Sequence, residues 1–181
     1  MALFSAKDQF CNYGFYHQNR INQIIHFIFI PVITFTFIMA LSTKVFIFGE
    51  PISITSSIQI PMNAASALLG VLMVYYALLD FPVSIFLNLE LASMLVYAQY
   101  LYNTTTSSEW MQIILFGQIV GWGTQFIGHA IEGKRPALID NILQIFNAPY
   151  FVVLEAYFFF GYNPTLHAQI KAEFESRNKS K

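Results

Sequence analysis

The side chains that could do chemistry in this sequence stand near its two ends. His17 and His26 lie near the start, and His129, Glu132 and Asp140 lie near the end. Imidazole and carboxylate groups suit metal sites that hold Fe(II), Mn or Zn, and they also transfer protons. A thiolate cage is excluded because the chain has a single cysteine. The sequence therefore favours a histidine site, with Glu132 and Asp140 as candidate catalytic groups, provided that the two ends meet.

Further polar residues adjoin these groups and are candidates for binding an anionic ligand. Lys134 and Arg135 follow the second group directly, and their cationic side chains could hold a carboxylate. Asn22 stands four residues before His26, so both lie on one face of a helix. We therefore expect Asn22, Lys134 and Arg135 to contact the same ligand as the histidines.

The composition indicates the class of protein that carries these residues. The 181 residues are 56% hydrophobic, 17% aromatic and only 10% charged, with a mean hydropathy of +0.53. These values are typical of membrane proteins rather than of soluble globular proteins. The formal net charge of −1 gives no general attraction to nucleic acid. The sequence predicts one membrane domain, residues 1–181, with no nucleic-acid partner.

The apolar stretches predict an all-α integral membrane protein built on a four-span helical bundle. We expect the break at Asp80-Phe81-Pro82 to form a tight reversal. Gly117 and Gly121 stand four residues apart, which favours the close approach of another helix. The predicted spans are residues 21–41, 62–79, 83–102 and 110–129.

The segments outside these spans predict shorter elements. Residues 1–20 predict a short helix or turn at the membrane surface, with Tyr13 in the interfacial belt. Residues 140–162 are apolar but are interrupted by Asn147 and Pro149, so we expect a re-entrant, peripheral or fifth helix. The polar tail, residues 163–181, predicts a C-terminal amphipathic helix. Its apolar stripe has a spacing of four residues and consists of Leu166, Ile170 and Phe174.

The number of crossings decides which residues can meet. Four crossings place the start of the first span and the end of the fourth on one side of the membrane. His17, His26 and His129 then lie together on that side, whereas His167 lies on the solvated tail. The cations before the first span and after the fourth lie on the same side, and only Lys44 lies opposite. An excess of cations marks the cytosolic side, so the site is expected to face the cytosol.

The segments that carry the histidines also contain longer motifs. One motif runs from Phe15 to His26, a second runs from Gln125 to His129, and a third runs from Arg135 to Asn141, followed by Ala148-Pro149-Tyr150-Phe151. In order and in composition they closely resemble the iron(II)-dependent 2-hydroxy fatty acid dioxygenase family, a membrane family of fatty acid α-oxidation. The resemblance covers most of the chain, although the middle, residues 42–110, matches in hydropathy only.

The resemblance implies an enzyme of the endoplasmic reticulum that removes one carbon from 2-hydroxy fatty acids during phytosphingosine breakdown. It implies that His17, His26 and His129 are ligands of Fe(II) and that O₂ is a substrate. A long-chain 2-hydroxy fatty acid would lie among the apolar helices. Its head group would lie at the end of the bundle that carries the histidines, where Lys134 or Arg135 would bind the carboxylate.

One spacing departs from that family and leaves other functions open. The family places an acidic residue four positions after the last histidine, whereas Glu132 stands three positions after His129. Both spacings keep the two side chains on one helical face. The alternatives are a non-catalytic accessory subunit of a larger complex, for example in the mitochondrial inner membrane, or a lipid or quinone binding protein. The subunit would need no metal, and its partner subunits would contact the C-terminal tail.

Overall fold

The computed structural model describes residues 4–43, 48–55 and 58–179. Helices dominate this part of the chain, so the predicted all-α class is confirmed. One small antiparallel hairpin pairs β1 (Ile52–Ser53) with β2 (Gln59–Ile60), in the segment between the first two predicted spans. The four long helices are α2 (Arg20–Leu41), α3 (Ala64–Leu79), α4 (Phe81–Thr104) and α5 (Ser107–Glu132).

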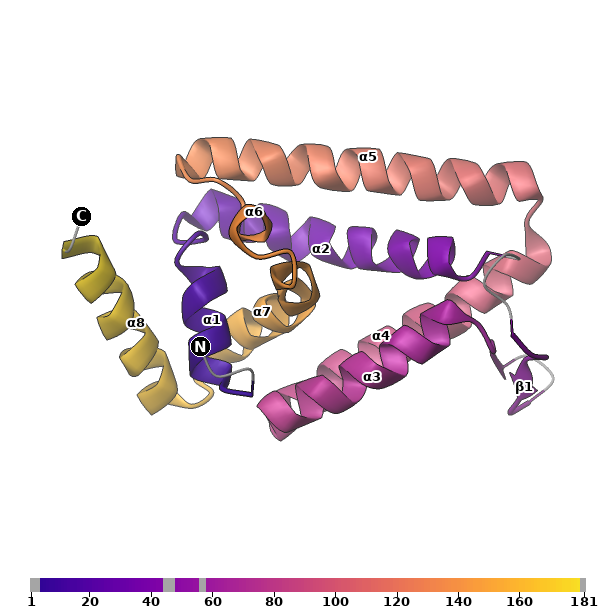
Figure 1. Cartoon of the computed structure of the whole chain (residues 1–181), viewed down its shortest axis with the longest axis horizontal. Coiled ribbons are helices and arrows are strands. Elements are labelled where there is room, and N and C mark those ends of the chain that lie inside the picture. Colours follow the sequence, from indigo (N-terminus) through magenta and orange to yellow (C-terminus); the bar gives the residue numbers. More distant parts are fainter. Residues whose placement is uncertain (1–3, 44–47, 56–57, 180–181) are drawn as a thin grey trace.

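Helices α2 and α5 form the pair that brings the two ends of the chain together. They lie side by side, with the start of α2 and the end of α5 at the same end of the molecule (Figure 1). A Cβ atom on Gly117 would lie 2.4 Å from Thr36 Cγ2, and one on Gly121 would lie 2.4 Å from Ile33 Cγ1. Only glycine fits at these two positions, which confirms the close approach expected from their spacing.

Local signals set the ends of these helices. Asp80 ends α3 and caps α4, because its carboxylate accepts a hydrogen bond from the Val83 amide at 3.3 Å. This confirms the predicted reversal. At the start of α5 the side chains of Thr106 and Glu109 form a reciprocal capping box. The helix ends at Gly133, whose φ of 71° favours glycine, and this places His129 in the last turn.

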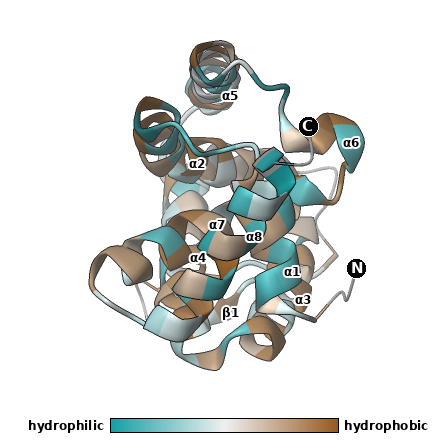
Figure 2. Cartoon of the chain, turned by 90° about the vertical axis from the view of Figure 1, so that its left-hand side faces the viewer, coloured by the Kyte–Doolittle hydropathy of each residue, from teal (hydrophilic) through white to brown (hydrophobic). Residues whose placement is uncertain are grey.

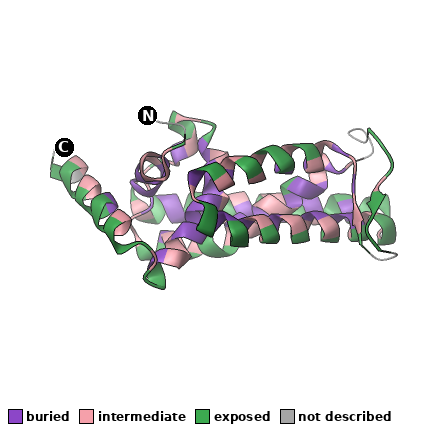
Figure 3. Cartoon of the chain, turned by 90° about the horizontal axis from the view of Figure 1, so that it is seen from below, coloured by how far each residue is buried: buried purple, intermediate pink, exposed green. Residues whose placement is uncertain are grey.

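The shorter helices gather at the end of the molecule where α2 begins (Figure 1). They are α1 (Ala6–Gly14), α6 (Ala137–Asp140), α7 (Gln144–Phe159) and α8 (Pro164–Lys179). Helix α7 runs through Pro149 without a break, so the interruption expected there does not end it. Buried residues are concentrated where α1 and α7 meet the long helices (Figure 3).

The C-terminal tail packs against its own chain. Helix α8 is more hydrophilic than the long helices (Figure 2), but its Ile170 is only 1% exposed. Phe174 lies so close to α1 that a Cβ on Gly14 would be 2.8 Å from its ring. The apolar stripe of the tail therefore packs against α1 and the core.

Among the described residues, two helices are long and apolar enough to cross a membrane by length and composition, namely α2 and α4. Helix α3 is also apolar but has only 16 residues. The arrangement of all four predicted spans within a membrane stays a prediction. Large apolar side chains on the outer faces of α3, α4 and α5 are exposed, including Val71, Leu78, Ile85, Leu89, Phe116 and Ile119.

Candidate metal centre

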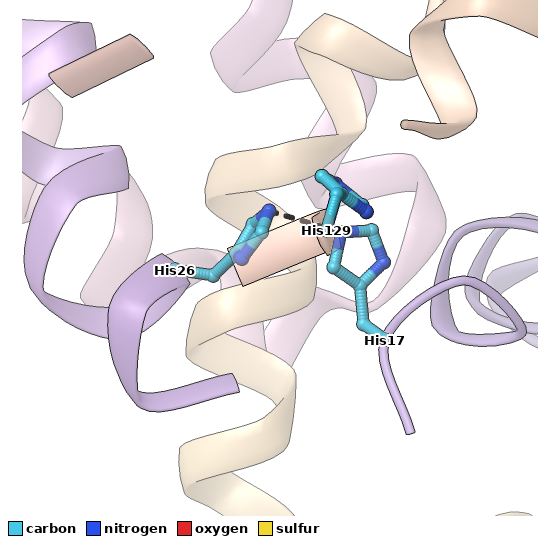
Figure 4. Close-up of side chains that lie close together, drawn as sticks. All are labelled: His17, His26 and His129. Atoms are coloured by element: carbon cyan, nitrogen blue, oxygen red, sulfur yellow. Dashed lines mark hydrogen bonds between the residues drawn. The ribbon is translucent and has the colours of Figure 1, made fainter. Parts of the chain in front are cut away.

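Three histidines from distant parts of the chain converge at the end of the α2–α5 pair. His17 lies between α1 and α2, His26 lies in the second turn of α2, and His129 lies in the last turn of α5. Their side chains point toward one another (Figure 4). One ring nitrogen from each lies within 4.8 Å of the others, and all three residues are buried. The sequence-based expectation that the two ends meet is confirmed, while the role of the histidines as ligands stays a prediction.

Backbone carbonyls fix the tautomer of two of the rings. His17 Nδ1 lies 2.7 Å from the Tyr13 carbonyl oxygen, and His26 Nδ1 lies 2.9 Å from the Asn22 carbonyl oxygen. A carbonyl only accepts, so both Nδ1 atoms carry the proton and donate it. Burial lowers the pKa of His17 well below its usual range, which keeps that ring neutral. In a neutral ring the lone pair is then on Nε2.

The donor set fits a metal ion. His17 Nε2 and His26 Nε2 face each other at 3.0 Å, and two lone pairs at this distance repel each other unless a cation lies between them. Two nitrogens that each bind one ion at about 2.1 Å, with an N–metal–N angle of roughly 90°, would also be about 3.0 Å apart. His129 Nδ1 is buried and has no hydrogen-bond partner among the described residues. These nitrogens suit Fe(II), Mn or Zn.

Tyr13 supports this site, a role that the sequence did not reveal. We expected Tyr13 at the membrane interface, but it is 5% exposed and its ring stacks on His17 with centroids 4.2 Å apart. Its carbonyl also orients the same imidazole. Groups that hold the second nitrogen of a ligand histidine tune metal affinity. The spacing of four residues between Tyr13 and His17 was the available signal.

Glu132 contacts the backbone before α2 rather than the group of histidine nitrogens. Its side chain is 4% exposed, and its two oxygens accept hydrogen bonds from the amides of Gln18 at 3.1 Å and Asn19 at 2.6 Å. These bonds join the end of α5 to the segment that carries His17. The structure therefore places Glu132 as a support for the site, and its predicted catalytic role stays untested.

The remaining charged candidates lie together outside the histidines. Lys134 Nζ donates to the Phe15 carbonyl at 2.7 Å and lies 4.5 Å from the centroid of the Phe15 ring. Arg135 pairs with Asp140 at 2.5 Å, and the Tyr16 hydroxyl donates to Asp140 at 2.6 Å. Each of these groups already has a partner within the chain.

Asn22 is fully buried, and it does not line the apolar cavity that the three histidines border. Its Oδ1 has no hydrogen-bond partner among the described residues, and it lies where a Cβ on Gly128 would be 2.3 Å away. Asn22 therefore packs between α2 and α5, and its carbonyl orients His26. Its predicted contact with substrate stays a prediction.

An apolar cavity of about 150 Å³ extends from the histidines between the long helices. All three histidines line it, and along α2 it reaches Ile38 and Leu41 near the far end of that helix. The residues of α3 that close that far region include Ala65 and Leu68. Polar side chains on its α5 wall are Gln118, Trp122 and Gln125.

His17 also borders a second, wider groove between α1, α2, α7 and α8. Glu155 and Lys171 line this groove. Gln23 links the wall of this groove to the site. Its side-chain Nε2 lies 3.0 Å from the His17 carbonyl oxygen and 3.4 Å from Glu155 Oε1. His17 thus lies between an apolar cavity and a groove with charged residues.

Comparisons with known proteins agree with the family expected from the motifs. Residues 3–160 match the family described as "2-hydroxy-palmitic acid dioxygenase Mpo1-like". The chain is also 34% identical, over 183 aligned positions, to the yeast protein named 2-hydroxy-palmitic acid dioxygenase MPO1 (Saccharomyces cerevisiae). That alignment covers 99% of this chain and 95% of the relative. No solved structure shows a significant match. This chain therefore belongs to the 2-hydroxy-palmitic acid dioxygenase Mpo1-like family.

Proposed function

We propose that this protein is an Fe(II)-dependent dioxygenase that shortens long-chain 2-hydroxy fatty acids by one carbon. The observation that carries the proposal is the position of three buried, converging histidines in the wall of an apolar cavity. The cavity suits an alkyl chain, and the histidines suit a metal that works with O₂. The name of the yeast relative supports the same substrate class.

The reaction balances without a further reductant. A 2-hydroxy acid and one molecule of O₂ give the fatty acid shorter by one carbon, CO₂ and water. The C1–C2 bond breaks, C2 is oxidised to the new carboxyl carbon, C1 leaves as CO₂, and O₂ is reduced by four electrons. Iron, when bound by His17, His26 and His129, would supply the redox chemistry that activates O₂ for this cleavage.

The cavity would bind and align the alkyl chain. From His26 to Leu41 the α2 helix rises about 22 Å, at about 1.5 Å per residue. An extended 16-carbon chain is about 19 Å long, because each C–C bond adds about 1.25 Å along the chain. In length, a palmitoyl chain would therefore match the part of α2 that lines the cavity, with its head group at the histidines and its methyl end near Ala65 and Leu68. The apolar walls would also keep water from the reacting end.

The charged residues would act at the entrance and in support of the site. Lys134 and Arg135 would attract the carboxylate as it approaches, and Asp140 would hold Arg135 in place through their ion pair. Glu132 would position His17 by holding the amides of Gln18 and Asn19. Proton exchange with water would pass through the groove beside His17, where Glu155 is available.

The experiment that tests the function is reconstitution of the purified protein with Fe(II) in the absence of oxygen. Addition of 2-hydroxypalmitate and O₂ should yield pentadecanoic acid and CO₂ in equal amounts. Full metal occupancy without product would reject the proposal. A protein that binds no metal would support an accessory subunit, and a protein that binds fatty acid without turnover would support a lipid carrier.

We propose further that the four long helices cross the membrane of the endoplasmic reticulum, with the histidines on the cytosolic side. The exposed apolar side chains on α3, α4 and α5 would then contact lipid. The test is to place an N-glycosylation acceptor, on a flexible spacer, either between α4 and α5 or after the last helix. Glycosylation of the first insertion alone is expected, and the opposite pattern would reject this orientation.

A further inference from the structure

Gln125 is a buried amide, and it lies in the wall of the cavity. The side chain is 3% exposed. Neither Nε2 nor Oε1 has a hydrogen-bond partner among the residues that the structure describes. A buried amide left unpaired destabilises the folded protein, so a native structure that keeps one needs a reason for it.

The position of this amide points to the reacting end of the ligand. Buried, unpartnered polar atoms occur on several described side chains, but among these residues only Gln125 and His129 line the cavity. The two residues are four apart on α5, so they occupy one helical face about 6 Å apart. Gln125 therefore lies one turn deeper in the cavity than His129, next to where a head group at the histidines would begin its alkyl chain.

The chemistry of the amide matches a 2-hydroxy acid. A glutamine side chain offers one acceptor oxygen and two donor hydrogens. A 2-hydroxy acid offers the complementary set, because its hydroxyl can donate to Oε1 while its carboxylate or hydroxyl oxygen accepts from Nε2. A fatty acid without the hydroxyl would leave Oε1 unpaired in an apolar cavity. Sites built to bind a substrate hydroxyl discriminate strongly against the analogue that lacks it.

We propose that Gln125 is the specificity-determining residue that distinguishes 2-hydroxy fatty acids from ordinary fatty acids. The inference rests on the proposed function, since it assigns a residue to the recognition of that substrate class. It predicts that the preference for the hydroxyl resides partly in this amide, separately from the affinity of the cavity for the alkyl chain.

Gln118 provides the matched control within the same helix and the same cavity. Its Nε2 donates to the Ile33 carbonyl at 3.0 Å and to Thr36 Oγ1 at 2.8 Å, and its Oε1 accepts from Trp122 at 3.0 Å. All of its hydrogen-bonding groups are therefore engaged by protein, two turns away from Gln125. Replacing Gln118 should affect packing between α2 and α5 but not the choice of ligand.

The test measures equilibrium binding of radiolabelled 2-hydroxypalmitate and palmitate to the Fe(II)-loaded protein without oxygen, so that no turnover occurs. Gln125→Met keeps the length of the side chain and removes its polar atoms, and Gln118→Met makes the same change at the control position. The ratio of the palmitate dissociation constant to the 2-hydroxypalmitate dissociation constant should fall about tenfold in Gln125→Met. Palmitate affinity and iron content should stay at wild-type levels, and Gln118→Met should keep the wild-type ratio.

A second variant allows the test to decide if Gln125→Met does not fold. Gln125→Asn keeps an amide but withdraws it by one methylene group, and it should lower the same ratio. An unchanged ratio in the folded Gln125 variants would overturn the inference, as would equal binding of both acids by the wild type. Turnover of 2-hydroxypalmitate by wild-type protein tests the proposed function separately, so the two can fail independently.

Discussion

His17 and His26 face each other through their Nε2 atoms at 3.0 Å, while both Nδ1 atoms donate to backbone carbonyls. The backbone thus turns two lone pairs toward one point, and this arrangement is unfavourable without a cation.

Replacing any of the three histidines by alanine should abolish stoichiometric metal binding, because two neutral imidazoles alone hold an ion weakly. The measurement is the metal content of purified protein after reconstitution and dialysis. His167→Ala is the matched control, since His167 lies on α8 and stacks on Phe158 at a centroid distance of 4.5 Å. Equal loss of metal in His167→Ala would contradict the assignment.

Glu132→Ala should weaken metal binding without removing a ligand. The substitution leaves the amides of Gln18 and Asn19 without their acceptor, which costs about 1–3 kcal/mol of folding stability. Loss of such a supporting contact typically lowers metal affinity 10–100-fold. Metal titration and the Tm in detergent provide the measurements. Glu175→Ala, on the exposed face of α8, should change neither, and wild-type affinity in Glu132→Ala would argue against the supporting role.

Glycines on α5 offer a matched test of the α2–α5 contact. Gly121→Ala should destabilise the protein by about 1–3 kcal/mol, because its Cβ would clash with Ile33. Gly123→Ala should be neutral or stabilising by up to about 1 kcal/mol, since nothing lies within 4 Å of its Cβ and alanine favours helix. Denaturation in detergent measures both. If Gly121→Ala were as stable as Gly123→Ala, the two helices would not approach so closely.

A larger side chain at the far end of the cavity should shorten the preferred substrate. Leu68→Trp adds bulk where α3 closes the cavity, so chains shorter than 16 carbons by roughly two to four methylene groups should react best. The measurement is kcat/KM across 2-hydroxy acids of different length. Leu78→Trp, on the exposed face of the same helix, should keep the wild-type profile. An unchanged profile in Leu68→Trp would show that the alkyl chain lies elsewhere.

The sequence predicted the convergence of the histidines because that required only a count of helices. An even number of passes returns the chain to its starting end, and His26 and His129 stand at the outer turns of the first and last passes. Residues 117–121 predicted the close approach of another helix, since small side chains fix where two helices can approach.

Other features depended on what packs opposite a residue, which spacing does not encode. Tyr13 was expected at the membrane surface, but α7 and α8 pack against α1, and the Tyr13 ring stacks on His17. Pro149 lies within α7 because its place near the start of the helix leaves most of the helical hydrogen bonds intact. The sequence does not distinguish Gln125 from other polar residues of a span, because its lack of hydrogen-bond partners among the described residues depends on the fold.

The separation of the histidines along the chain also sets an order of events during synthesis. His129 follows His26 by 129 − 26 = 103 positions, so at about 5–20 residues per second it leaves the ribosome roughly 5–20 s later. The third nitrogen is therefore absent while α2, α3 and α4 are being made. An ion that binds all three histidine nitrogens would bind only after α5 has packed against α2. It would then link the first and last long helices.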